Sequence, residues 1–136
     1  MQYTLANTIN TPSGTLNASK VVSGDVNLEA DFTVGAGATN TAETISIIQS
    51  TLVAVVLLFN ATGATPASPI GGHLTLKTNS SGSPQETITL NDGVPLVYPA
   101  GGVAIPFAGN VTAFYMTDAS TGAVGGILHV RALTNQ

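Results

Sequence analysis

The chain has 136 residues and only 7% of them are charged, with three Lys or Arg against seven Asp or Glu and a net charge of −4. An ordinary soluble domain carries about 25% charged residues, and binding to nucleic-acid phosphates requires clustered Lys and Arg. This composition therefore argues against a nucleic-acid partner. The longest apolar run, Leu52 to Phe59, is much shorter than the roughly 20 residues of a membrane-spanning helix, so no membrane partner is expected.

The length predicts a single domain, residues 1–136, which is large enough to form a hydrophobic core without cross-links. The chain has no cysteine, which excludes disulfides and thiolate metal sites. Its first residues lack the basic start and apolar run of a signal peptide. We therefore expect synthesis in a cytoplasm and a soluble protein until assembly.

The N-terminal stretch leaves two interpretations open. Tyr3 to Ile9 and Leu16 to Val22 favour one or two strands, so that residues 1–18 form an N-terminal strand or arm. Between them, Thr8 to Asn17 is polar and rich in turn-forming residues. This segment is either an arm that lies on a neighbouring subunit or a simple loop between strands.

The clearest strand pattern runs from Asp25 to Val34. Apolar and polar residues alternate there, with Val26, Leu28, Ala30, Phe32 and Val34 on one side and Asp25, Asn27, Glu29, Asp31 and Thr33 on the other. A period of two residues predicts a strand with one buried and one solvated face.

Further strands are expected at short intervals. Leu52 to Phe59 is apolar throughout and predicts a central strand that is covered on both faces. The remaining predicted strands are Glu43 to Ile48, His73 to Thr78, Glu86 to Leu90, Val94 to Tyr98, Val111 to Thr117 and Ile127 to Leu133. Pro95 marks Val94 to Tyr98 as an edge strand or a strand end. About eight or nine short strands predict an all-β protein, a single β-sandwich of jelly-roll type.

The connections between these strands contain turn residues. Asn91-Asp92-Gly93 is expected to form a tight hairpin, because these residue types adopt the left-handed conformations that such turns need. Asn79 to Pro84 predicts a longer hairpin loop. Gly63 to Gly72 and Pro99 to Gly109 are predicted to be crossing loops.

Residues with catalytic potential are few. His73 and His129 each lie on a predicted strand, and no Gly-x-Ser-x-Gly nucleophile elbow is present. We therefore expect no enzyme activity and no cofactor. Asp25, Glu29 and Asp31 share one strand face, and their oxygens suit Ca²⁺. Because residues two apart on a strand are separated by about 6.5–7 Å, we expect a solvated face, or one that faces Lys20, Lys77 or Arg131 of a neighbour, rather than a metal site.

The C-terminal third carries a resemblance to a known group of proteins. Its residues read LNDGVPLVY at Leu90 to Tyr98, IPFAGNVTAFYMTDAS at Ile105 to Ser120 and ILHVRAL at Ile127 to Leu133. This succession of tight turn, Pro-containing loop, aromatic strand with a Thr-Asp-Ala-Ser turn and final aliphatic strand resembles small virion proteins of tailed bacteriophages. The rest of the chain matches them only in composition.

The resemblance implies a structural virion protein of the decoration, or cement, type. Such a protein would bind the major capsid protein on the outside of the capsid, after synthesis in the host cytoplasm. The alternative is a phage tail, neck or fibre-head protein that binds a receptor, and a third hypothesis is a bacterial surface or pilus-like subunit. No catalytic, cofactor or metal residue is carried over from the resemblance.

The expected oligomer is a homotrimer, which the resemblance implies and which the 43% hydrophobic content favours. The candidate interface residues are Ile70, Val103, Ile105 and Phe107, because they lie in Pro-containing loops that would lose little entropy on docking. Phe107 has two possible roles. It is either an anchor in the interface or a residue that closes the core of the sandwich.

Overall fold

The computed structural model of this chain describes residues 2–11, 14–24, 26–62, 73–99, 106–120, 122 and 124–135. Within these ranges the structure contains ten strands and one short 3-10 helix, η1 (Gln49–Thr51). The strands are β1 (Gln2–Thr11), β2 (Gly14–Ser23), β3 (Val26–Val34), β4 (Thr41–Ile47), β5 (Leu52–Ala61), β6 (His73–Thr78), β7 (Thr87–Asn91), β8 (Leu96–Pro99), β9 (Val111–Asp118) and β10 (Gly126–Thr134). None of the described segments is a helix long and apolar enough to cross a membrane.

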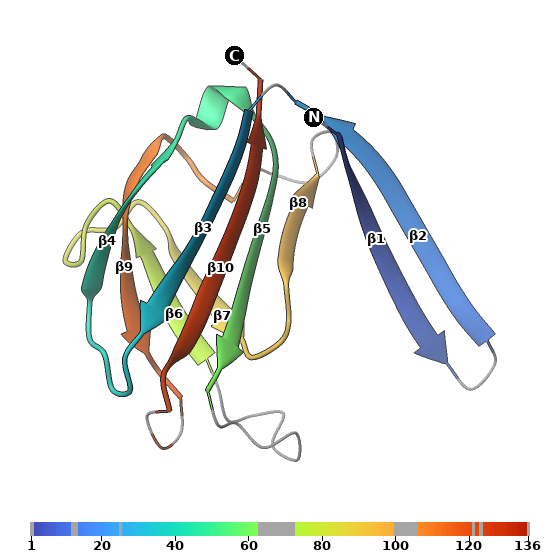
Figure 1. Cartoon of the computed structure of the whole chain (residues 1–136). Helices are drawn as coiled ribbons and strands as arrows, with labels where there is room; N and C mark the ends of the chain where they lie inside the picture. Colours follow the sequence, from blue (N-terminus) through green and yellow to red (C-terminus); the bar gives the residue numbers. More distant parts are fainter. Residues whose placement is uncertain are drawn as a thin grey trace.

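Eight of the strands form two packed sheets (Figure 1). One sheet has the order β3-β10-β5-β8 and the other has the order β4-β9-β6-β7, and all neighbouring strands are antiparallel. From β4 to β10, consecutive strands lie in opposite sheets except for β6 and β7, which is the winding of a jelly roll. The predicted all-β sandwich is confirmed.

The alternation in β3 has the predicted effect. Leu28, Ala30 and Phe32 pack against the core and Val34 is buried within it. The residues between them, including Glu29 and Asp31, are exposed on the outer face of the sheet. Burial of one face therefore fixes the register of this strand, because a slip of one residue would bury the carboxylates instead.

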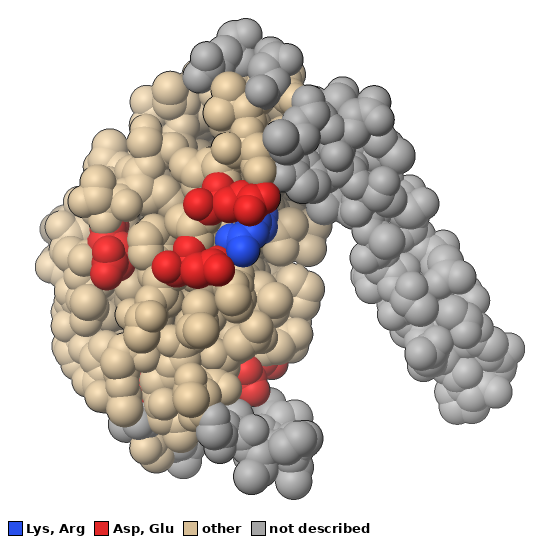
Figure 2. Space-filling model, in the orientation of Figure 1, with Lys and Arg blue, Asp and Glu red and all other residues tan. Residues whose placement is uncertain are grey.

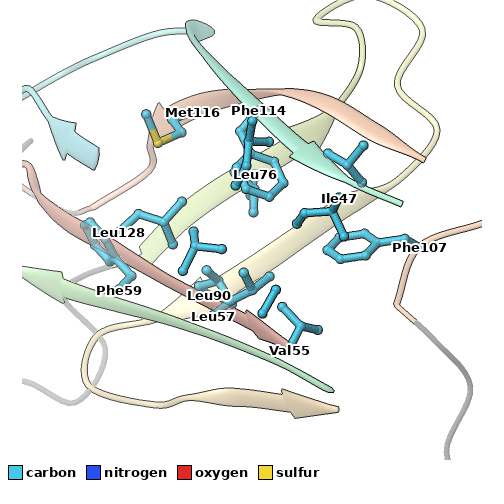
Figure 3. Packing of buried hydrophobic residues seen from close by; sticks show 14 of the residues in the cluster. Ile47, Val55, Leu57, Phe59, Leu76, Leu90, Phe107, Phe114, Met116 and Leu128 are labelled. Atoms are coloured by element: carbon cyan, nitrogen blue, oxygen red, sulfur yellow. The ribbon is translucent and has the colours of Figure 1, made fainter. Parts of the chain in front are cut away.

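The core lies between the two sheets (Figure 3). On β5, Val55, Leu57 and Phe59 are fully buried and point into it. The prediction that β5 is a central strand is confirmed, because it lies between β10 and β8. The expected burial of both its faces is wrong, since Val56 and Leu58 on the other face are only half-buried.

The Asn91-Asp92-Gly93 turn does not close a hairpin, contrary to the sequence-based prediction. β7 and β8 lie in different sheets, so this turn carries the chain across the sandwich. Gly93 has the expected positive φ of 68°. Its N–H donates to the carbonyl of Phe59 over 2.8 Å, and the Asp92 side chain accepts from the N–H of Ala61 over 2.7 Å. These bonds to the end of β5 hold the turn between the sheets. Turn chemistry alone could not distinguish a crossing from a hairpin.

The loop between β6 and β7 is a hairpin connection, as predicted for Asn79 to Pro84. Asn79 begins it in the left-handed region, with φ of 63°. Its side-chain amide donates to the carbonyl of Asn110 over 2.8 Å, and its Oδ1 accepts from the N–H of Thr112 over 2.7 Å. The side chain therefore connects the β6–β7 loop to the beginning of β9.

Two substitutions at Asn79 should separate these roles. Asn79→Gly keeps the positive φ but removes the side-chain hydrogen bonds, and we expect a loss of about 1–2 kcal/mol in the free energy of unfolding. Asn79→Ala should cost roughly a further 1 kcal/mol, because alanine is disfavoured in the left-handed region. Urea unfolding measures both values. Equal stability of the Gly variant and the natural protein would show that the side-chain bonds contribute nothing.

The N-terminal strands β1 and β2 form a two-stranded antiparallel sheet of their own. In Figure 1 this hairpin leaves the sandwich at the end of the molecule where the C-terminus lies, and it joins neither of the larger sheets. Of the two predictions for this stretch, one strand or two, the structure shows two. Residues 12 and 13, which connect the two strands in the sequence, lie outside the described residues.

Candidate functional site

The outer face of the β3-β10-β5-β8 sheet carries most of the features that could bind a partner. Strand pairing arranges its outward residues in rows that cross the sheet. One row joins Glu29, Arg131, Val56 and Val97. The next row joins Asp31, His129 and Leu58. Both rows are therefore ionic over β3 and β10 and apolar over β5, and the first row continues with an apolar residue on β8.

The ionic half of this face is a compact cluster. Arg131 Nη1 donates to Oδ1 of Asp31 over 2.7 Å, and its Nε lies 3.9 Å from Oε2 of Glu29. His129 Nδ1 lies 2.9 Å from the same Asp31 oxygen. The hydrogen bond from Arg131 and then that from His129 lower the pKa of Asp31 below its ordinary value. We call Glu29, Asp31, His129 and Arg131 the ionic cluster. Figure 2 shows acidic side chains on both sides of a basic one on this face of the molecule.

The apolar half of the face is formed by Val56 and Leu58 on β5, Val97 on β8 and Ile127 on β10. We call these four residues the outer strip. Val97 is 42% exposed and Ile127 is 38% exposed, and Val56 and Leu58 are half-buried. Toward the end of β5 nearest the N-terminal hairpin, the neighbouring residues Ala54 and Leu133 are already buried. A partner could therefore cover the outer strip without displacing any core residue.

Replacement of Arg131 tests the ionic cluster. Arg131→Gln should move the pKa of Asp31 back up toward its ordinary value of 3.8, because the largest cause of its lowering is removed. The free energy of unfolding should hardly change, since exposed ion pairs contribute little. An NMR titration of the Asp31 carboxyl and a urea melt measure the two effects. An unchanged pKa for Asp31 would contradict this assignment.

The ionic cluster contains two of the three acids, Asp25, Glu29 and Asp31, that the sequence analysis considered as Ca²⁺ ligands or as ion-pair partners. Glu29 and Asp31 face Arg131 of the same chain. Asp25 lies outside the described residues. Within the described ranges, no three His, Asp or Glu side chains are close enough together to hold a metal ion.

The candidate interface residues fall in two groups. Ile70, Val103 and Ile105 lie outside the described residues. Phe107 is only 1% exposed, and its ring centroid lies 6.5 Å from that of Phe114. Figure 3 shows Phe107 entering the core from the segment that precedes β9. Of its two predicted roles, this position fits the one that closes the core.

The two histidines occupy different environments. His129 is held by Asp31 on the open sheet face. The backbone carbonyl of His73 accepts from the N–H of Ala119 over 2.9 Å, so this residue ties β6 to the segment after β9. Sequence reasoning missed that His129, Arg131 and the acids of β3 meet. The available signal was the second alternation, at Ile127, His129 and Arg131, which marks another half-solvated strand.

Comparison with known proteins adds the following result: no family model, no curated protein and no solved structure matches this chain. Its class is therefore described by its fold and by the outer face of the β3-β10-β5-β8 sheet. It is a jelly-roll β-sandwich with one sheet face that is ionic over β3 and β10 and partly apolar over β5 and β8, and with an additional N-terminal hairpin.

Proposed function

We propose that this protein is a structural virion protein that decorates and cements the outside of a bacteriophage capsid by binding the major capsid protein. The observation that carries the proposal is a sandwich whose surface has very few charges, given that 7% of the chain is charged. Such a surface can be buried against other subunits with little cost for desolvating ions. The resemblance of the C-terminal third to small phage virion proteins points the same way.

The fold is compatible with this function but does not select it. Jelly rolls occur in viral capsid proteins and also in lectins and cupins, so the fold by itself does not identify the function. A repeating capsid lattice suits a protein with only modest single contacts, because many weak contacts together give strong attachment. The proposed oligomer on this lattice is a homotrimer.

A reconstitution experiment tests the proposal. Phage heads that lack this protein would be mixed with the purified protein, and the bound copies counted by quantitative mass spectrometry against the major capsid protein. We expect binding that saturates at a fixed, high ratio to the major capsid protein, and heads that resist heat better after binding. Purified tails serve as the matched control and should bind nothing.

The same experiment distinguishes the main alternative. A tail, neck or fibre-head protein would bind tails, or would saturate heads at a few copies at a single vertex. Either outcome would overturn the cement function, because a cement protein must contact subunits over the whole lattice.

A further inference from the structure

The β1–β2 hairpin has a strand edge on each side with which no strand is paired. β1 and β2 pair with each other over all ten residues without a register shift, and in the described structure no other strand pairs with either of them. β2 also lies close to β5 of its own chain, but those two strands are not paired. Every second residue of an edge strand directs its backbone N–H and C=O away from its partner strand. Each side of the hairpin therefore presents a row of backbone groups that another strand can bind.

The four edge strands of the sandwich each carry a feature that hinders the addition of a further strand. β3 has the exposed acids Glu29 and Asp31, and β4 contains a register shift between Thr44 and Ile47. β7 has only five residues, and β8 has four residues and ends at Pro99. Charge, irregular pairing, short length and proline are the usual means by which proteins keep sheet edges from pairing with other chains.

The two hairpin strands have little of this protection. β1 is ten residues long and contains no charged residue and no proline, and β2 is equally long and contains a single charged residue, Lys20. Long strands without charge or proline are those that pair most readily with other chains. A two-stranded hairpin is also only marginally stable by itself and gains stability from a third strand. The hairpin therefore fits a partner that supplies another strand edge.

We propose that this partner is another copy of the same chain: β1 of one copy pairs with β2 of the next, and three copies close into a ring. Each copy supplies both edges, and the two edges match in length. Pairing of β1 with β2 of the next copy uses both edges. Pairing of β1 with β1 across a two-fold axis would leave the β2 edges open. Only a closed ring leaves no hairpin edge unpaired.

Three is the smallest number of hairpins that closes such a ring. With two strands in each hairpin, two hairpins supply four strands and three supply six, and small closed barrels have about five strands or more. A three-fold axis parallel to the strands preserves strand direction. β1 of each copy therefore runs antiparallel to β2 of the next, as within the hairpin itself. This ring would be the contact that holds the homotrimer of the proposed function together.

The connection to β3 holds the base of the hairpin in place. Only residues 24 and 25 separate β2 from β3. Gly24 is buried, and a Cβ at this position would lie 2.6 Å from the Leu133 side chain and 2.8 Å from the Thr134 carbonyl. This close packing fixes the point where the hairpin leaves the sandwich, and from there both strands extend beside it (Figure 1). The sandwich therefore presents the hairpin to other copies from a fixed base.

Hydrogen exchange, measured residue by residue by NMR, tests the pairing in the natural protein. In an edge strand only every second backbone N–H is bonded to the partner strand, so only alternate amides exchange slowly. At high dilution we expect protection of alternate amides at most in β1 and β2. At high micromolar concentration the remaining amides of both strands should slow at least ten-fold. Sedimentation equilibrium at that concentration should give three times the chain mass of 13.6 kDa.

Three results would overturn the proposal. A monomer at high micromolar concentration would exclude this self-association. A trimer that keeps the alternate pattern of exchange in β1 and β2 would place its contact elsewhere in the chain. A dimer in which β1 alone gains protection would show two-fold pairing of β1 instead of a closed ring.

A matched pair of variants adds the same charge to two different edge strands. Asn7→Lys, in the middle of β1, should weaken self-association at least ten-fold, because charge on an edge strand hinders pairing. Thr33→Lys, at an exposed position of β3, should leave self-association unchanged. Equal association of the two variants would contradict the proposal, and circular dichroism melts check that both are folded. These experiments use the purified protein alone, so their outcome does not depend on capsid binding.

Discussion

Replacement of Phe107 with alanine is expected to lower the free energy of unfolding by about 3–5 kcal/mol, the usual cost of removing a fully buried aromatic side chain. Phe107 is 1% exposed and packs against Phe114. The ring of Phe114 also contacts that of Phe32 edge-on, with 6.4 Å between the two ring centroids. The variant would therefore lose contacts in the centre of the core and leave a cavity. Urea and thermal unfolding measure the loss.

The matched control for this prediction is Val94→Ala, at a valine that is 56% exposed. It should change the free energy of unfolding by no more than about 0.5 kcal/mol. If the Phe107→Ala protein melted like the natural one but failed to attach to capsids, the side chain would be an interface anchor instead. Early melting with attachment retained at low temperature would support the core role.

Loss of the Asp118 carboxylate should have the second largest effect. Asp118 accepts hydrogen bonds from three backbone N–H groups, those of Gly37 and Gly125 at 2.9 Å and that of Ser120 at 3.0 Å. It therefore holds together the β3–β4 loop and the β9–β10 connection. Asp118→Ala would leave these donors without their acceptor, and we expect a loss of about 2–4 kcal/mol. Asp92→Asn is the comparison, since that side chain accepts from one backbone N–H and should cost less.

Asp118 also predicts a dependence of stability on pH. Desolvation by burial raises its pKa, but hydrogen bonds from Ser120, Gly37 and Gly125 outweigh that effect and lower the pKa from 3.8 to about 2. Because the folded-state pKa is depressed, the stabilisation is fully present above pH 3.8 and is lost as the pH falls through that value to about 2. The stability difference between the natural protein and Asp118→Asn should therefore shrink over this window. A constant difference would contradict this explanation.

The positions of the strands were largely predictable, because each depends on a local pattern. His73–Thr78 agrees with its predicted bounds, and the other strands differ at their ends by only a few residues. The alternation of β3 and the apolar run of β5 are properties of consecutive residues. Burial of one face then selects the strand conformation without reference to the rest of the chain.

The composition of the candidate site was less predictable. The acids of β3 were identified in the sequence, but their partners are 100 residues away for Asp31 and Arg131 and 98 residues away for Asp31 and His129. Which strands become neighbours depends on the winding of both sheets, and local patterns do not encode it. The Asn91-Asp92-Gly93 turn shows the same limit, since its residues determine the backbone conformation but not the sheet that the next strand joins.

The sequence by itself therefore determined the all-β class, the strand positions, the nearly uncharged surface and the absence of disulfides, because these follow from residue types and their spacing. Tertiary structure alone decided that one face of β5 remains partly open, that Phe107 is buried, and that Arg131 meets the acids of β3. The physical reason is that burial and ion pairing are properties of segments brought together by folding. A residue's own neighbours in the chain cannot specify which distant segment will cover it.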